Sequence, residues 1–394
     1  MQRPLQEDAC AKQEASLSSL TAMPTQSAKK IPAASPADDA PAVARKVGLR
    51  YVDDGKPGIT RKKTAAGFRY VAPDGKPVRD EDELKRIRAL AIPPAWTGVW
   101  ICPQANGHIQ ATGRDAKNRK QYRYHAQWRS VRDESKYERM LSFGSALPRI
   151  RAKVNEALSL PGLPREKVLA TVVVLLQETM IRVGNEEYAR TNKSFGLTTL
   201  RNRHVEVSGR EIEFHFRGKS GVMHSIRLKD PKLARIVRRI RDLPGQELFQ
   251  YLDDEGERHS IDSADVNDYL RSLTGEDYTA KDFRTWSGTL LAALELQALR
   301  GAESEADVKK NIVQAIATVA QRLGNTPAVC RKCYVHPAVL DCYLQGLMHE
   351  TWDTLMASLK VPANDPHALK MEEMAVLALL ESRRQAALET ATAS

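Results

Sequence analysis

The stretch REKVLATVVVLLQETMIRVGNEEYA, residues 165–189, decides the fold. It runs without a glycine or proline until Gly184, which is longer than an ordinary strand and typical of a core helix. Its uninterrupted aliphatic part, residues 168–176, is far shorter than the roughly 20 residues that span a bilayer. The segment therefore predicts the central helix of a mainly helical globular domain rather than a membrane span.

A β-rich interruption follows at residues 204–228, HVEVSGREIEFHFRGKSGVMHSIRL. Apolar residues alternate with polar ones in three runs: Val205 and Val207, then Ile212, Phe214 and Phe216, then Ile226 and Leu228. Because SG and GKSG separate the runs, the pattern predicts three short antiparallel strands with Lys219 exposed in the second turn. Helical periodicity returns in residues 263–275, 280–301, 309–324 and 371–391, with Gly324 as a typical C-cap.

The segment before the helical domain has a different sequence pattern. Residues 49–141 combine turn sequences such as YVDDGKPG with β-branched and aromatic residues, which predicts short strands, with one helix at residues 80–90. Residues 1–45, rich in Ala, Pro, Ser, Thr and Gln, predict a disordered tail. The expected fold class is α+β, with the tail, a small β-rich domain (46–142) and a larger, mainly α-helical domain (143–394) that carries the three-stranded insert.

The chain of 394 residues is basic, with 60 Lys and Arg against 49 Asp and Glu and a net charge of +11. Such a positive field favours polyanions or anionic membranes as partners. The first residues contain acids and no sustained apolar run, so no secretory signal is predicted. The five cysteines, an odd number, then fit reduced thiols better than a disulfide framework, and we expect a cytoplasmic protein.

Residues 114–132, RDAKNRKQYRYHAQWRSVR, interleave basic side chains with Tyr122, Tyr124 and Trp128. Basic groups neutralise phosphates, and aromatic rings stack on sugars or bases, so one interpretation is a nucleic-acid surface. The alternative is a solvated basic loop whose rings belong to the domain core. The sequence leaves both interpretations open.

Gly218-Lys219-Ser220 has the ending of a phosphate-binding P-loop, but Glu213 stands where that motif requires a glycine. A P-loop is therefore excluded. What remains is a lysine on a glycine-flanked hairpin, which is either an ordinary exposed turn residue or a mobile proton donor.

Two arginines sit beside apolar helical segments. Arg182 must extend to solvent, pair with an acid such as Glu178, or point into a site. Arg284 poses the same choice, and Lys281 precedes it by about one helical turn. Two cations on one face repel each other unless an anion lies between them, which mildly indicates a phosphate site.

Residues 330–342 contain a cysteine pair and a histidine that suggest a zinc site: Cys330, Cys333, His336 and Cys342. Their spacing departs from the usual zinc motifs, and Pro337 would lie within the ligand loop. A thioredoxin-like role requires a βαβ setting, whereas this region has a helical pattern. No metal is predicted, and the thiols are interpreted as buried or incidental.

Taken together, these motifs resemble the poxvirus-type class IB DNA topoisomerases, specifically their bacterial relatives. The resemblance covers about residues 48–350, in order. GRDAKNRKQYRYH resembles the DNA-contacting loop, ETMIRVGNEEYARTNKSFGLTTLRNRHV the first catalytic-arginine segment, FRGKSG the catalytic-lysine hairpin and KDFRTW the second arginine. LGNTPAVCRKCY resembles the segment that ends in the nucleophilic tyrosine, with Asn325 where the family usually has histidine.

The resemblance implies a C-shaped clamp around double-stranded DNA and an enzyme that relaxes supercoils without ATP, cofactor or required metal. Its catalytic residues would be Arg182, Lys219, Arg284, Asn325 and Tyr334. Tyr334 would form a 3′-phosphotyrosine, the arginines would hold phosphate oxygens, and Lys219 would protonate the leaving oxygen. Asn325 would keep a hydrogen-bond donor but lose the cationic charge and the acid–base chemistry of an imidazole.

The same resemblance implies DNA contacts by Arg119, Gln121, Tyr122, Tyr124, Tyr188 and Lys281, and a monomeric, nucleoid-associated protein. A tyrosine recombinase uses similar chemistry, but it usually carries H-x-x-R where this chain has Lys281-Asp-Phe-Arg284. A non-catalytic DNA-binding architectural protein is the third interpretation.

Overall fold

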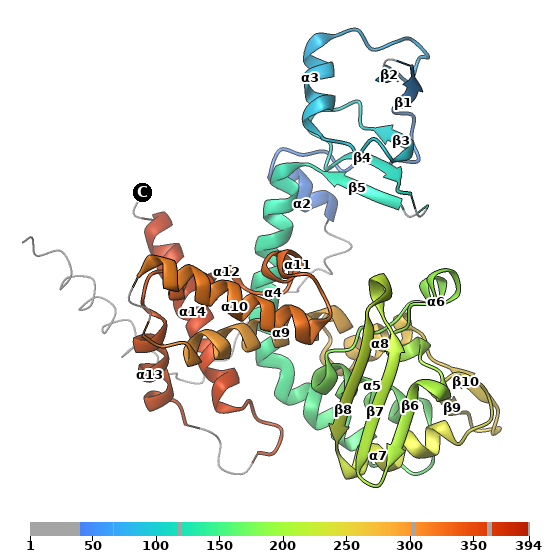
Figure 1. Ribbon diagram of the computed structural model, residues 1–394, viewed down its shortest axis with the longest axis vertical. Helices are drawn as coiled ribbons and strands as arrows, with labels where there is room; N and C mark the ends of the chain where they lie inside the picture. The colour runs from blue at the N-terminus through green and yellow to red at the C-terminus, as the bar shows by residue number, and fades with distance from the viewer. Residues whose placement is uncertain are drawn as a thin grey trace, which may run out of the picture. The chain divides into compact units, whose positions relative to one another are not determined.

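The computed structural model describes residues 40–65, 67–116, 118, 120–301, 304–360 and 365–392 (Figure 1). Most of the predicted tail, residues 1–39, and Arg119 lie outside the described residues. The expectation of a tail up to residue 45 is wrong at its end, because helix α2 (Ala40–Lys46) begins there. Its Ala40 and Ala44 are buried against Leu49 and Trp128, so this short segment has an apolar partner after all.

The β-rich region is an antiparallel five-stranded sheet in the order β2-β1-β3-β4-β5. Its strands are β1 (Ile59–Thr64), β2 (Gly67–Val71), β3 (Thr97–Ile101), β4 (Ile109–Arg114) and β5 (Lys120–Tyr124). The expected helix is α3 (Glu81–Ala89), which begins where the side chain of Asp80 accepts the amides of Asp82 and Glu83. Ile87 of α3 packs with Ile101 and other sheet residues in one core, and the strands and the helix that the sequence predicted here are confirmed.

The longest helix, α4 (Ala126–Ala157), continues through residues 142 and 143, where the sequence placed the domain boundary. Buried Leu141, Phe143 and Leu147 lie on this helix, so no break separates the two sides of that boundary. Helix α5 (Arg165–Thr179) is the predicted central helix, and most of its side chains are buried. The prediction that it extends to residue 189 is wrong, because Met180 adopts the left-handed conformation and ends the helix. It packs against α4, α8 (Ser263–Thr274) and α9 (Ala280–Ala298).

The predicted three-stranded insert is confirmed as the sheet β6-β7-β8, whose strands lie side by side in Figure 1. They are β6 (Val205–Ser208), β7 (Glu211–Arg217) and β8 (Met223–Lys229), and helix α7 (Pro231–Arg241) packs against β6 and β7. Strands β9 (Gln250–Leu252) and β10 (Arg258–Ser260) form a further hairpin that the sequence did not reveal, since three residues are too few to show alternation.

Two of the remaining helices were predicted, α10 (Glu305–Leu323) and α14 (Met371–Thr392), and the helical pattern around the cysteine pair is resolved into α11 (Pro327–Cys333) and α12 (Pro337–Leu344). Two more, α6 (Glu186–Asn192) and α13 (Met348–Ser358), were not predicted as separate helices. Gly324 ends α10 in the left-handed conformation with φ of 58°, as its C-cap prediction requires. Val376 and Leu379 of α14 are fully buried, so the last helix belongs to the core. Within the described ranges, no helix is both long and apolar enough to cross a membrane.

Candidate active site

A cavity of about 430 Å³ collects most of the side chains that the sequence singled out. Arg182, Tyr188, Lys219, Lys281, Arg284 and Tyr334 line it. They come from five separate segments between residues 182 and 334, so the fold assembles this site from distant parts of the chain. Gln121, Tyr122 and Tyr124 are on β5 and are not among the lining residues.

Arg284 is buried in the site, with only 4% of its surface exposed. It projects from α9 and donates hydrogen bonds to the carbonyl oxygens of Met180 and Leu323, the second over 2.8 Å. Its Nε is buried without a hydrogen-bond partner. Burial lowers the pKa of the guanidinium, and no described carboxylate pairs with it. A buried, unpaired cation of this kind is suited to hold an anionic ligand.

Arg182 lies next to it and donates to the carbonyl oxygen of Gly324 over 3.0 Å and to Oδ1 of Asn325. Burial and then repulsion by Arg284 lower the pKa of Arg182 to about 10. The expected default partner, Glu178, instead accepts a hydrogen bond from Gln177. Both arginines thus contact the end of α10 through main-chain carbonyls, and their charges are not neutralised by an acid within the described residues.

Asn325 is oriented by its contact with Arg182. Because Oδ1 accepts the guanidinium, the NH₂ group must point the other way, and Nδ2 is buried without a partner. Buried donors are nearly always hydrogen-bonded in a complete complex. The unpaired Nδ2 therefore marks a place for an acceptor oxygen beside the two arginines.

Tyr334 follows the last turn of α11, where its amide donates to the carbonyl of Cys330 over 2.9 Å. Its own carbonyl accepts a hydrogen bond of 3.2 Å from the hydroxyl of Thr289 on α9. A Cβ at Gly288 would come within 2.7 Å of that carbonyl, so only glycine lets the two segments approach this closely. From α4, Lys136 Nζ donates to the carbonyl of Cys333 over 2.6 Å. The nucleophile candidate is therefore held by its main chain, and it lines the cavity beside Arg284.

Lys219 occupies the turn between β7 and β8, as predicted, and its side chain is exposed. The amide of Gly218 donates to Val222 O over 2.7 Å and closes the turn. Ser220 adopts a positive φ of 62°, which is uncommon for a residue other than glycine. The turn thus presents the lysine at the mouth of the site on a tightly closed backbone.

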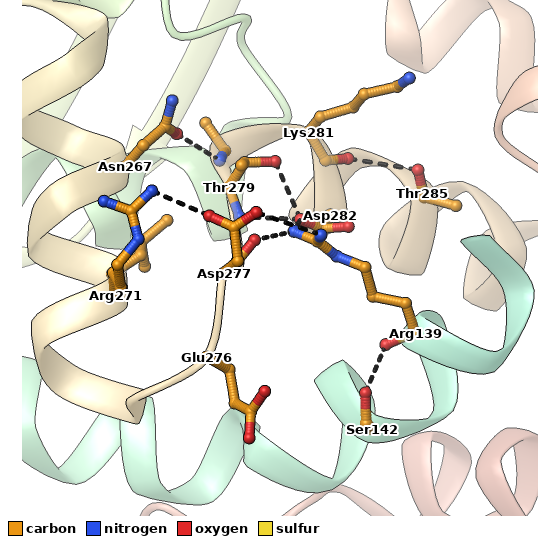
Figure 2. A network of polar contacts seen from close by, with 12 residues as sticks. Arg139, Ser142, Asn267, Arg271, Glu276, Asp277, Thr279, Lys281, Asp282 and Thr285 are labelled. Atoms are coloured by element: carbon orange, nitrogen blue, oxygen red, sulfur yellow. Dashed lines mark hydrogen bonds and ion pairs between the residues drawn. The ribbon is translucent and has the colours of Figure 1, made fainter. Parts of the chain in front are cut away.

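The start of α9 is fixed by the polar network shown in Figure 2. Asp282 accepts the amide of Thr279 over 2.8 Å and Arg139 Nη2 over 2.9 Å, and Arg139 also donates to the carbonyl of Asp277. Lys281 extends away from this network in Figure 2 and is exposed. The sequence did not point to Arg139. The T-x-x-D pattern from Thr279 to Asp282 is a capping-box signal, and it could have located the start of α9.

Tyr188 lies on α6, whose N-cap Asn185 accepts the amide of Tyr188 over 3.0 Å through its side chain. Tyr188 is 46% exposed and lines the cavity. It is therefore available to a ligand larger than a single phosphate.

Residues 114–132 had two interpretations, a nucleic-acid surface or a basic loop whose rings belong to the core, and each fits part of the segment. Trp128 is 6% exposed and belongs to the core, whereas Tyr122 and Tyr124 are exposed and stack on each other with centroids 5.8 Å apart. Gln121 Nε2 donates to Asp115 over 3.0 Å. The tyrosines thus form a flat exposed aromatic surface on β5.

Two of the three cysteines that raised the question of a metal are buried among helices, whereas Cys333 is partly exposed. Cys330 and Cys342 have no exposed surface, and burial raises the pKa of each thiol. Across the described residues, no group of three or more His, Cys, Asp or Glu side chains is placed to hold a metal ion.

Comparison with known proteins identifies the family. The model of the eukaryotic DNA topoisomerase I catalytic core matches residues 125–354, and that of the bacterial DNA topoisomerase IB N-terminal domain matches residues 67–115. DNA topoisomerase 1B of Acanthamoeba polyphaga mimivirus is 33% identical over 293 residues, which cover 73% of this chain and 87% of the viral protein. The chain belongs to the type IB DNA topoisomerases.

A more distant relative supports the same family. DNA topoisomerase 1B of vaccinia virus (strain Copenhagen) is 26% identical over 278 residues, or 67% of this chain and 83% of the viral protein. A type IB topoisomerase is an isomerase of DNA topology, so the family gives DNA as the substrate class. The recombinase and architectural interpretations are thereby disfavoured.

Proposed function

We propose that this topoisomerase relaxes supercoiled duplex DNA by cutting one strand with Tyr334, allowing rotation, and resealing the strand. As the phenol of Tyr334 gives up its proton to solvent, its oxygen forms a bond to the scissile phosphorus while the bond from phosphorus to the 5′-oxygen breaks. The products are a 3′-phosphotyrosine and a 5′-hydroxyl. Because the phosphotyrosine conserves the phosphodiester bond energy, attack by the 5′-hydroxyl reseals the strand, and ATP is not consumed.

The positive charge for this reaction comes from Arg182 and Arg284. Charge accumulates on the non-bridging oxygens in the transition state, and preorganised donors aimed at such oxygens contribute on the order of 10²–10³-fold each to the rate. Asn325 Nδ2 is a third donor beside them. With guanidinium groups in this role, the mechanism does not require a metal ion.

Lys219 is the proposed proton donor to the leaving 5′-oxygen. An alkoxide is a poor leaving group, so a proton must arrive as the bond to phosphorus breaks. Its position on an exposed turn allows the ammonium to approach an oxygen of DNA that occupies the cavity. In resealing, the same lysine takes the proton back.

We propose that DNA also contacts Lys281, Tyr188, Gln121, Tyr122 and Tyr124, together with Arg119, and that the β-rich region and the helical region close around the duplex as a monomeric clamp. Exposed Lys281 and the stacked tyrosines support the DNA contacts, since phosphate neutralisation and ring stacking are the usual sources of affinity for nucleic acid.

One observation carries the proposal: two cations without acid partners, Arg182 and Arg284, line a single cavity together with Tyr334. Asn325 is not among the residues that line this cavity, but it contacts Arg182 and keeps an unpaired amide donor. This arrangement matches a phosphodiester and the nucleophile that attacks it. A recombinase would share that chemistry but would depend on a special DNA sequence.

The test is relaxation of a supercoiled plasmid in EDTA without ATP, followed by denaturation to trap a covalent protein–DNA adduct. We expect relaxation of plasmids with unrelated sequences and an adduct on the 3′ side of the nick. An adduct confined to one sequence, with strand exchange, would support the recombinase. DNA binding without any adduct would support the architectural protein.

A further inference from the structure

His224 interrupts the apolar face of β8. It is in phase with Ile226 and Leu228, so the alternation turns its ring toward the covered side of the sheet. There it stacks on Phe216, its cross-strand partner, with ring centroids 5.0 Å apart and planes 17° apart. A histidine among apolar neighbours calls for a reason beyond packing of the sheet.

The edge of the His224 ring fits against two glycines from distant segments. A Cβ at Gly218 would come within 2.6 Å of His224 Cδ2 and Nε2, and a Cβ at Gly324 within 2.3 Å of Cε1. Real Cβ atoms do not approach other atoms this closely. A side chain at either position would therefore have to displace the ring or the segment beside it.

Each glycine adjoins a residue of the proposed site. Gly218 precedes Lys219, and Gly324 precedes Asn325 and accepts the hydrogen bond from Arg182. The ring thus lies between the turn that carries the lysine and the helix end that holds the arginine.

We propose that His224 is a positioning residue: its ring fixes the Lys219 turn against the C-terminus of α10, and so sets the lysine relative to the phosphate. This inference rests on the proposed function, in which Lys219 protonates the leaving oxygen. Burial and then repulsion by Arg182 and Arg284 lower the pKa of His224. The ring is therefore neutral and acts through its shape rather than its charge.

The first test compares two DNA substrates in single-turnover cleavage. Replacing the leaving 5′-oxygen with sulfur removes the need for a proton, because a thiolate leaves readily. We expect His224→Ala to slow cleavage of ordinary DNA about 10- to 100-fold, since displacement of a catalytic group by about 1 Å can cost 10²-fold. On the sulfur substrate its rate should return to within a few-fold of wild type, with DNA affinity unchanged on both.

The matched control is His215→Ala, on the neighbouring strand and on the exposed face of the sheet. It should cleave both substrates at the wild-type rate. An equal loss by His224→Ala on both substrates, or no loss on either, would overturn the positioning role. Lys219→Ala separates the two proposals: if sulfur does not rescue that variant, the assignment of Lys219 as the proton donor fails instead.

The second test uses the glycine contact itself. Gly218 has φ of −92°, so alanine is allowed there by the backbone and obstructed only by the ring. Gly218→Ala should slow cleavage, whereas adding it to His224→Ala should cause little further loss, because the obstruction has gone. Losses that multiply in the double variant would show that the ring does not hold the turn through this contact.

Discussion

The guanidinium carbon of Arg284 lies 5.3 Å from the centre of the Tyr334 ring. Such a contact is within the range of a cation–π interaction. It joins the most deeply buried cation of the site to the candidate nucleophile, although 50 residues separate them in the sequence. A phosphate oxygen bound by Arg284 is consequently brought beside the phenol ring.

Tyr334→Phe should bind DNA with unchanged affinity and form no covalent adduct, because it lacks only the attacking oxygen. Trapping with denaturant after incubation with plasmid measures this directly. Tyr343→Phe is the matched control: that hydroxyl donates to Leu299 O over 2.8 Å and accepts from Asn311 over 2.7 Å, which is a structural role. The control should still form the adduct and lose about 1 kcal/mol of stability. An adduct in Tyr334→Phe, lost in Tyr343→Phe, would move the nucleophile to position 343.

Arg182→Lys should lower the single-turnover cleavage rate by about 10²-fold or more. Lysine preserves the charge but cannot contact Gly324 O, Asn325 Oδ1 and a phosphate together as a planar fork can. Arg165→Lys is the control, since Arg165 forms an exposed ion pair with Asp265 and should cleave normally. A fully active Arg182→Lys would mean that charge alone is needed at this position.

Asn325→Ala should slow cleavage, because it removes both the Nδ2 donor and the acceptor that orients Arg182. Asn325→His should keep or raise the rate, since an imidazole also supplies a donor at this place. Rapid-quench kinetics on one duplex would compare both with wild type. A large loss in the histidine variant would show that position 325 acts mainly by accepting the Arg182 hydrogen bond rather than by donating to phosphate.

The sequence was sufficient for the elements that carry strong local patterns. The apolar run of α5, the alternation of β6, β7 and β8, and Gly324 at the end of α10 all depend on nearest neighbours along the chain. The domain boundary predicted at residue 142 lies in the middle of α4. The sequence pattern changes from strand-like to helical at that point, whereas the helix itself runs from Ala126 to Ala157 without a break.

Less of the site than of the fold could be predicted from the sequence. Lys281 and Arg284 on one helix face indicated a phosphate site, but the catalytic roles of Arg182, Lys219 and Arg284 came only from a family resemblance. Local patterns could not show that Arg182 contacts Asn325 rather than Glu178, because that choice depends on where α10 ends in space. The contact of His224 with two distant glycines is likewise a purely tertiary feature.

Glu373→Ala should destabilise the protein by about 3–5 kcal/mol, because it leaves Arg151 buried without its partner. Arg151 binds both carboxylate oxygens, over 2.7 and 2.9 Å, and Glu373 also accepts the amide of Lys370 at the start of α14. Although burial raises the pKa of Glu373, the bonds from Arg151 hold it below the ordinary value. Urea unfolding measures the loss, and exposed Glu372→Ala should change stability by less than about 0.5 kcal/mol. Equal effects at the two positions would exclude the proposed importance of this pair.

His336, two residues after Tyr334, should make stability depend on acid. Its Nδ1 accepts the amide of Ala338 over 3.0 Å at the start of α12, which requires an unprotonated nitrogen. Burial and then repulsion by Lys136 lower its pKa from 6.5 to about 4. The unfolded chain therefore takes up a proton before the folded one does, as pH falls through 6.5.

The stabilisation from the neutral ring is thus fully present above about pH 6.5, is lost as pH falls toward 4, and amounts to at most about 3 kcal/mol. His336→Asn keeps an N-cap acceptor without a titrating group, so its free energy of unfolding should fall less than that of wild type over this range. Urea denaturation at pH 7, 5.5 and 4.5 measures the difference, with exposed His215→Asn as the control. Parallel pH profiles for wild type and His336→Asn would show that other groups, such as the buried carboxylate of Glu373, account for the acid sensitivity.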